Sequence, residues 1–163
     1  MIKLVRCDDR MIHGQCIVRI LGDFHIKRII GVDDFTAGNA MLKKIYQMAT
    51  PPQITSGIYT AEEAVGEIRQ HIGDSENTLV LFKNPLTALI LFRAVNDIPK
   101  ELNIGPVSNR KNTRKATMYA YLTDEEVMAL DEMASMGIRV YFNQINDQNT
   151  EEWENVKARM KSS

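Results

Sequence analysis

The feature that most constrains the fold is an alternation of short apolar runs with amphipathic segments of helical period. The runs are rich in β-branched and aromatic residues and bounded by Gly, Pro, Asn or Asp, which is typical of strands. Repeats of strand, helix and strand favour parallel neighbours joined by right-handed crossovers. We therefore expect residues 1–163 to form a single α/β domain, with an open, mostly parallel twisted sheet of about six to seven strands and helices on both faces. The predicted strands are Ile2–Cys7, Arg28–Val32, Gln53–Tyr59, Thr78–Lys83, Glu101–Ile104, Ala116–Leu122 and Arg139–Gln144.

Several of the intervening helices have recognisable ends. Thr60–Glu63 and Thr123–Glu126 each have the spacing of a capping box, which opens a helix. A helix over Met41–Met48 must end before Pro51–Pro52, because the proline rings cannot continue it. The last helix is predicted to start near Thr150.

Composition excludes several classes of protein. The formal net charge of -1 gives no general attraction to nucleic acid or to an anionic membrane. No apolar stretch approaches the roughly 20 residues that span a bilayer, and a strand-like segment stands where a signal peptide would begin. The two cysteines have neither CxxC spacing nor sequence partners for a metal cluster. We expect a cytosolic protein with reduced thiols, with no metal and no cofactor.

The most reactive segment runs from Asp8 to Gln15, directly after the first predicted strand. It gathers Asp8, Asp9, Arg10 and His13 in one short loop that leads into a helix. In an open α/β sheet, the functional crevice lies beyond the carboxyl ends of the strands. The position of the loop therefore agrees with that of a functional site.

This loop could carry a phosphoryl group on histidine. A neutral imidazole nitrogen can attack phosphorus near neutral pH, and we assign that role to His13. The guanidinium of Arg10 can place its planar fork on the phosphoryl oxygens. The backbone N–H groups of Gly14 and Gln15, at the start of the following helix, can bind the same oxygens.

The two carboxylates allow more than one interpretation. Asp9, or with less preference Asp8, could orient the imidazole ring or cap the helix, and Asp8 could also line the phosphate site. The alternative is that both carboxylates cap the helix, Arg10 pairs with one of them, and His13 is simply exposed. Spacing alone does not decide between these interpretations.

Two further polar segments are candidates for the same site. Lys83 and Asn84 end the fourth predicted strand, which lies close to the first in a doubly wound sheet. They could reach the phosphate, or they could form a turn before a helix. Residues 110–115 hold four cations, which form either a solvated loop or a rim that steers a phosphorylated partner. Nucleic-acid binding is not expected, because the loop lacks interleaved aromatic residues.

The stretch Val5–Gln15 closely resembles the active-site signature of the IIB components in the mannose/fructose/sorbose family of the sugar phosphotransferase system (PTS). After Gly105 this family usually continues with a second glycine and a methionine, whereas this chain continues with Pro106. We therefore expect a different rim on the site. The resemblance continues, in family order, through Lys27–Asp34, Met48–Pro52, Val80–Pro85 and Pro99–Gly105.

The resemblance implies a cytoplasmic phosphocarrier, a phosphohistidine–sugar phosphotransferase component. A IIA protein or domain would donate a phosphoryl group to His13, with Arg10 and Asp9 as neighbours. The group would then pass to a sugar delivered by the IIC and IID membrane subunits. Met11 and Ile12 would form part of a shallow apolar docking surface. The sugar and the oligomeric state, including a homo-oligomer, stay open.

Two other classes of function fit the sequence less well. A receiver-type signalling module needs a phospho-acceptor aspartate after its third strand, and Gln53–Tyr59 offers none. A nucleotide-dependent enzyme or another small-molecule-binding doubly wound domain needs a phosphate cradle, and neither GxxxxGK[ST] nor GxGxxG is present. The sequence therefore favours phosphoryl transfer through His13.

Overall fold

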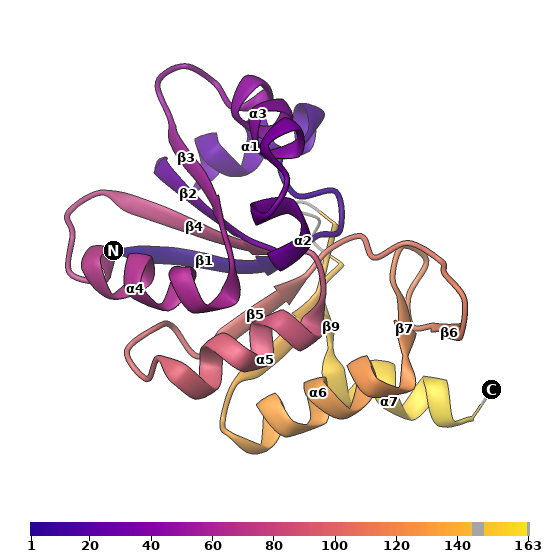
Figure 1. Cartoon of the computed structure of the whole chain (residues 1–163). Helices are drawn as coiled ribbons and strands as arrows, with labels where there is room; N and C mark the ends of the chain where they lie inside the picture. The colour runs from indigo at the N-terminus through magenta and orange to yellow at the C-terminus, as the bar shows by residue number, and fades with distance from the viewer. Residues whose placement is uncertain (145–148, 163) are drawn as a thin grey trace.

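The structure is a computed structural model that describes residues 1–144 and 149–162, except for the side chain of Gln15. Its main sheet has seven strands in the order β3-β2-β4-β1-β5-β8-β9, and β6 and β7 form a separate two-stranded sheet (Figure 1). The strands are β1 (Ile2–Cys7), β2 (Ile26–Val32), β3 (Thr55–Tyr59), β4 (Asn77–Phe82), β5 (Glu101–Ile104), β6 (Thr113–Lys115), β7 (Tyr121–Thr123), β8 (Arg139–Phe142) and β9 (Glu151–Glu152). The helices are α1 (Gly14–Asp23), α2 (Asp34–Ala37), α3 (Ala40–Ala49), α4 (Ala61–His71), α5 (Pro85–Ala94), α6 (Asp124–Ser135) and α7 (Trp153–Lys161).

The strands β3, β2, β4, β1, β5 and β8 all pair in parallel, and among the described residues only β9 joins the sheet in antiparallel fashion. The predicted open, mostly parallel α/β sheet is therefore confirmed. β1 lies in the middle of the sheet between β4 and β5, so the loop that follows it opens at the centre of the carboxyl edge.

Helices cover both faces of the sheet, and each face has its own apolar cluster. In Figure 1, α1 and α3 lie on one side of the sheet, and α4 and α5 lie on the other. Successive residues of β4 alternate between the two clusters, as the pleat of a strand requires. Leu79 and Leu81 pack with the residues of α1, whereas Val80 and Phe82 pack in the larger cluster. Within the described residues, no helix is long and apolar enough to cross a membrane.

The two predicted capping boxes are confirmed. The hydroxyl of Thr60 accepts from the backbone of Glu63 at 3.1 Å, and the Glu63 carboxylate accepts from the backbone of Thr60 at 2.9 Å. Thr123 and Glu126 make the same pair of bonds at the start of α6. The helix over Met41–Met48 ends at Ala49, before the two prolines, as predicted.

Two predictions in the last third of the chain are wrong. The apolar run Ala116–Leu122 is not one strand, because residues 116–120 form a turn between β6 and β7 that Ala116 closes by donating to the carbonyl of Ala120 at 2.9 Å. Ala116, Ala120 and Leu122 are buried in the larger apolar cluster without joining the main sheet, and Met118 is exposed. The last helix begins at Trp153 and not near Thr150, because Glu151–Glu152 pairs with β8 as a short edge strand.

Candidate functional site

The loop after β1 is held at the carboxyl ends of its two neighbouring strands. The backbone N–H of Asp8 donates to the carbonyl of Phe82, the last residue of β4, at 2.9 Å. The N–H of Asp9 donates to the carbonyl of Pro106 at 3.1 Å, beyond the end of β5. Backbone hydrogen bonds on both sides therefore fix the position of the loop that follows the central strand.

A tight turn then reverses the chain toward α1. Met11 donates its N–H to the carbonyl of Asp8 at 2.9 Å and adopts a positive φ of 53°, while Gly14 at the helix start has a φ of 46°. Glycine suits such a left-handed position because it has no Cβ. Met11 and Ile12 are almost fully buried, so the expectation that they form a docking surface is wrong. Their side chains anchor the turn in the core under α1.

His13 faces a buried carboxylate. Its Nε2 lies 3.2 Å from Oδ2 of Asp8, whose side chain is 2% exposed, whereas the side chain of His13 is 23% exposed. His13 is also the N-cap residue of α1, but its side chain makes no capping hydrogen bond. The structure thus places Asp8 beside the ring, and not Asp9 as the sequence favoured. Neither carboxylate caps α1.

Arg6 is a second buried group at this site, and the sequence analysis missed it. Its Nη2 lies 3.7 Å from Oδ2 of Asp8, and both side chains are almost fully buried. The guanidinium also donates to Oδ1 of Asn103 and to the carbonyl of Gln144. A Cβ at Gly105 would overlap this guanidinium. The available signal was an arginine within the apolar run of β1, where an unpaired charge is costly.

Arg10 lies on the open side of the same carboxylate. Its backbone N–H donates to Oδ1 of Asp8 at 3.1 Å, and its Nε lies 3.8 Å from that oxygen. The side chain is 54% exposed, unlike that of Arg6. Asp8 is therefore flanked by one buried and one accessible guanidinium, and the accessible one stands near His13.

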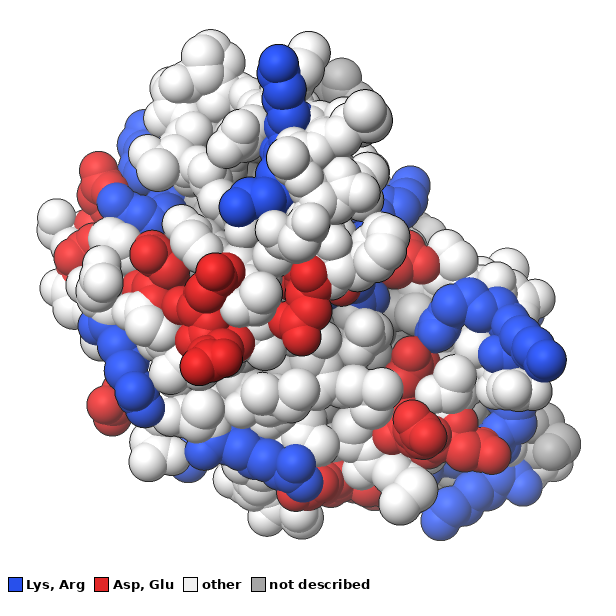
Figure 2. Space-filling view, viewed as in Figure 1, with Lys and Arg blue, Asp and Glu red and all other residues white. Residues whose placement is uncertain are grey.

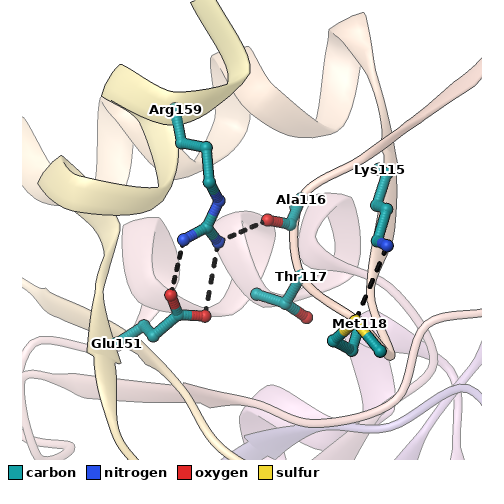
Figure 3. Close-up of a pocket in the computed structure, with 6 residues that line it drawn as sticks. All are labelled: Lys115, Ala116, Thr117, Met118, Glu151 and Arg159. Atoms are coloured by element: carbon teal, nitrogen blue, oxygen red, sulfur yellow. Dashed lines mark hydrogen bonds and ion pairs between the residues drawn. The ribbon is translucent and has the colours of Figure 1, made fainter. Parts of the chain in front are cut away.

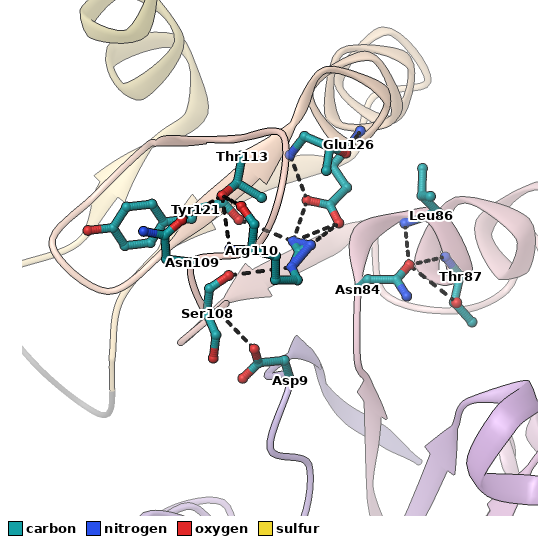
Figure 4. A network of polar contacts seen from close by, with 11 residues as sticks. Asp9, Asn84, Leu86, Thr87, Ser108, Asn109, Arg110, Thr113, Tyr121 and Glu126 are labelled. Carbon is teal, nitrogen blue, oxygen red and sulfur yellow. Dashed lines mark hydrogen bonds and ion pairs between the residues drawn. The ribbon is translucent and has the colours of Figure 1, made fainter.

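Asp9 points toward Ser108, in the segment after β5 (Figure 4). Its Oδ2 accepts from the backbone of Ser108 at 2.7 Å. From there, Arg110 donates from its Nε to the carbonyl of Ser108 at 3.4 Å and from its Nη atoms to Glu126 at 2.9–3.0 Å. Burial raises the pKa of Glu126, although Arg110 opposes that shift. Asp9 thus ties the loop to the β6–β7 hairpin and to α6.

The remaining candidates occupy different positions. Oδ1 of Asn84 accepts from the backbone of Leu86 and Thr87 at 3.0 and 3.2 Å, which makes Asn84 the N-cap of α5. Lys83 follows the end of β4, the strand beside β1, and forms no ion pair with any described residue. Gly14 and Gln15 begin α1, as expected, and the Gln15 side chain lies outside the described part of the structure.

The basic loop 110–115 is partly neutralised within the protein. Arg110 pairs with Glu126 at 2.9 Å, and Arg114 pairs with Asp124 at 3.1 Å. Lys111 and Lys115 remain exposed. Figure 2 shows blue side chains over the hairpin and red ones beside them, so this region has mixed charge and is not a uniformly positive rim.

A pocket of about 470 Å³ lies between the hairpin and α7 (Figure 3). It is separate from the loop after β1, because none of its lining residues belongs to that loop. Arg159 spans it, donating to Glu151 at 2.6 Å and to the carbonyl of Ala116 at 2.7 Å. The lining residues are Lys115, Ala116, Thr117, Met118, Glu151 and Arg159.

Fold and site together define a class of protein: an open α/β domain that presents a carboxylate-paired histidine beyond its central strand. Residues 2–163 match the family described as the PTS system sorbose subfamily IIB component. The chain therefore belongs to this family of phosphotransferase components. The resemblance carried by Val5–Gln15 and the later segments is confirmed.

Several bacterial proteins are similar to this chain in sequence or in fold. The chain is 24% identical to the fructose-specific EIIB component of Bacillus subtilis, over 93% of each protein. It is 23% identical to the mannose-specific EIIAB component of Escherichia coli, but covers only 45% of that longer protein and 89% of itself. It superimposes on the IIBSor domain of the sorbose permease of Klebsiella pneumoniae with a TM-score of 0.90 at 24% identity, over 98% of this chain and 97% of the other. The TM-score is 0.86 for manxB of Thermoanaerobacter tengcongensis, at 29% identity, over 98% and 96%.

Proposed function

We propose that this chain, as one IIB domain, is a cytoplasmic phosphocarrier that accepts a phosphoryl group on Nδ1 of His13. A IIA protein would be the donor, and a hexose or amino sugar translocated by IIC and IID subunits would be the acceptor. The observation that carries the proposal is the contact between Nε2 of His13 and the buried carboxylate of Asp8. The family match over residues 2–163 supports the assignment.

The contact with Asp8 selects one tautomer of the ring. A carboxylate accepts hydrogen bonds, so Nε2 of His13 carries the proton and donates it to Oδ2. A neutral imidazole has only one N–H, and Nδ1 therefore holds the lone pair. No described side chain hydrogen bonds to Nδ1. Nδ1 is thus the nucleophile of the proposed reaction.

The transfer step balances without an external base. The lone pair on Nδ1 attacks phosphorus as the P–N bond of the donor phosphohistidine breaks, and the bonding pair returns to the donor nitrogen. A donor ring protonated on its other nitrogen leaves as neutral imidazole. The ring of His13 becomes positively charged, and the carboxylate of Asp8 stabilises that charge at 3.2 Å.

The groups that bind the phosphoryl oxygens are the accessible guanidinium of Arg10 and the first amides of α1. The first N–H groups of a helix have no partner within the helix, and their dipoles favour an anion. His13 leaves these amides without a side-chain cap, so they remain available to the ligand. Arg10 adds a full positive charge that can rotate toward the oxygens, since its side chain is half exposed.

The surface beside the loop offers apolar side chains for a transient partner. Phe35 on α2 and Met41 and Met48 on α3 are each more than 70% exposed. Tyr46 of α3 packs against the apolar cluster that holds Met11 and Ile12, which places that helix on the same face of the sheet as the loop. Exposed apolar side chains next to the reactive group suit a small interface that must release one partner for the next.

The test is phosphorylation of the purified chain by a phosphoenolpyruvate-driven relay that ends in a IIA protein. We expect label on His13 that is lost in acid and retained in base, since a phosphoramidate is acid-labile. His13→Ala should accept no label, and the matched control His71→Ala should be labelled as fully as the wild type. Full labelling of His13→Ala, or a base-labile acyl phosphate, would overturn the proposal.

A further inference from the structure

Three different metal-binding side chains meet at the start of α1. One ligand atom from each of Asp8, His13 and Cys16 lies within 4.8 Å of the other two. The carboxylate and the imidazole are already 3.2 Å apart. Ligand atoms around a tetrahedral Zn²⁺ are separated by roughly 3.5 Å, given bonds of about 2.0–2.3 Å. A small movement of the cysteine side chain therefore brings its sulfur to a ligand position.

The spacing of the segment explains why the three groups converge. His13 is the N-cap of α1, and Cys16 is the third residue of the helix. An N-cap side chain and the side chain three residues later lie on the same side of the helix start, as in a capping box. Asp8 returns to the same point through the turn that Met11 closes. The sequence spacing had offered no partner for either cysteine, whereas the fold supplies two for Cys16.

We propose that Asp8, His13 and Cys16 form a site for a thiophilic divalent cation such as Zn²⁺. Thiolate and imidazole ligands favour Zn²⁺, Co²⁺ or Cu over Mg²⁺ or Ca²⁺, which prefer oxygen ligands alone. Three protein ligands leave a fourth position open on the accessible side of His13. Two of the ligands are buried and one is partly exposed, so the cation reaches the site past the imidazole.

The positive charges of Arg6 and Arg10 lower the expected affinity of the site for a cation. Both guanidinium groups lie within 4 Å of the Asp8 carboxylate and oppose a second cation there. The negative charges of Asp8 and of the metal-bound thiolate offset this repulsion. We therefore expect a readily exchangeable site that a chelator empties, in contrast to a permanent structural metal.

Metal at this site blocks the acceptance of a phosphoryl group, an inference that rests on the proposed function. A cation bound to Nε2 of His13 uses the lone pair of that nitrogen, so the proton moves to Nδ1. Nδ1 then has no lone pair with which to attack phosphorus. A cation bound to Nδ1 would occupy the nucleophile directly. In either geometry, phosphorylation and metal binding compete for the same ring.

Co²⁺ titration of the full chain tests the site without any phosphoryl donor. We expect the near-ultraviolet charge-transfer band of a cobalt–thiolate bond, which Zn²⁺ removes and excess Mg²⁺ does not. Cys16→Ser should abolish the band, and His13→Ala should weaken binding at least tenfold. Cys7→Ser is the matched control, because Cys7 is fully buried in the other apolar cluster. A band that survives in Cys16→Ser, or disappears in Cys7→Ser, would overturn the site.

A second measurement separates this site from the proposed function. The chelator-treated wild type should accept a phosphoryl group, and Zn²⁺ added to the purified chain should slow that acceptance. Chelator should then restore it, and Cys16→Ser should resist Zn²⁺. If chelator-treated protein accepts no group, the proposed function fails while the cobalt result still decides the metal site. If Zn²⁺ binds but leaves acceptance unchanged, competition for the ring is disproved.

Discussion

The protein contains two groups of histidine, aspartate and arginine at opposite ends of its sheet. At the carboxyl end of β1, His13 pairs with Asp8 at 3.2 Å beside Arg6 and Arg10. At the amino end of the strands, His71 pairs with Asp74 at 2.7 Å, and Arg28 lies 3.3 Å from the same carboxylate. The second pair is the closer one, yet the first has the surroundings that the proposed phosphoryl transfer needs.

The difference lies in burial and in the end of the helix that each histidine occupies. Asp8 is 2% exposed, whereas Asp74 is 36% exposed and shares its site with solvent. His13 stands at the N-terminus of α1, where free amides attract an anion. His71 stands in the last turn of α4, where carbonyl groups favour a cation and disfavour phosphate. The same residue types therefore acquire different roles from their position.

The largest expected contrast is between Asp8→Asn and Asp74→Asn. Asp8→Asn removes the acceptor that fixes the tautomer of His13, so acceptance of the phosphoryl group should slow by about 100-fold or more. It also leaves Arg6 buried without its carboxylate, which should cost about 3 kcal/mol of unfolding free energy. Asp74→Asn should leave acceptance unchanged. Rapid-quench labelling and urea unfolding measure the two effects, and equal rates in both variants would contradict the distinction.

Gly105→Ala and Gly66→Ala compare packing in the same two regions. A Cβ at Gly105 overlaps the Arg6 guanidinium, so the change should destabilise the fold by about 1–3 kcal/mol. Gly66 lies within α4 with no atom near a new Cβ, and alanine there should stabilise by about 0.5–1 kcal/mol. Urea denaturation checks both values. Opposite signs are expected, and a stabilising Gly105→Ala would show that Arg6 is free to move.

A smaller contrast concerns the shape of the arginine side chains. Arg10→Lys keeps the charge but loses the planar fork, so transfer should slow by roughly tenfold. Arg28→Lys should leave transfer unchanged, because Arg28 lies at the other end of the sheet. Steady-state transfer from a IIA donor is the measurement. Unchanged transfer in Arg10→Lys would mean that the helix amides alone bind the phosphoryl oxygens.

The smallest expected effect is a pH dependence of stability at the second group. The hydrogen bond from His71 lowers the pKa of Asp74 below its ordinary value of 3.8. The pair therefore stabilises the folded state above that value, and the contribution is lost as the pH falls below 3.8 through the lowered pKa. Asp74→Asn should flatten this part of the acid unfolding curve slightly. A curve that matches the wild type below pH 3.8 would show that the exposed pair contributes nothing.

The sequence was sufficient for features that depend on neighbours in the chain. The end of β1, the capping boxes at Thr60 and Thr123, and the stop before Pro51 all follow from local patterns, and the structure has each of them. The prediction that His13 lies in the loop between the first strand and a helix also rests on local patterns. Local periodicity and capping are properties of a single segment, so one sequence reveals them.

The details of the candidate site depend on contacts between distant segments. Asp8 and Asp9 are adjacent and identical in type, and only the backbone after β5 assigns Asp9 to Ser108. The burial of Arg6 depends on Asn103 and Gln144, about 100 residues or more away. The partners of Asp9 and Arg6 therefore cannot be predicted from the spacing of one loop. The hairpin was missed for the same reason, because its buried residues pack in the larger apolar cluster without joining the main sheet.

The position of Glu126 has a practical consequence for engineering this protein. Its carboxylate accepts hydrogen bonds from the backbone N–H of Thr123, at the start of α6, and from the guanidinium of Arg110. The base of the hairpin is therefore held independently of its tip. Met118 lies in the turn at the tip, between β6 and β7, and its side chain is 82% exposed. A dye attached at Met118 should leave the anchored base undisturbed. The hairpin tip is thus a suitable position for a label that reports the binding of a partner at the neighbouring loop.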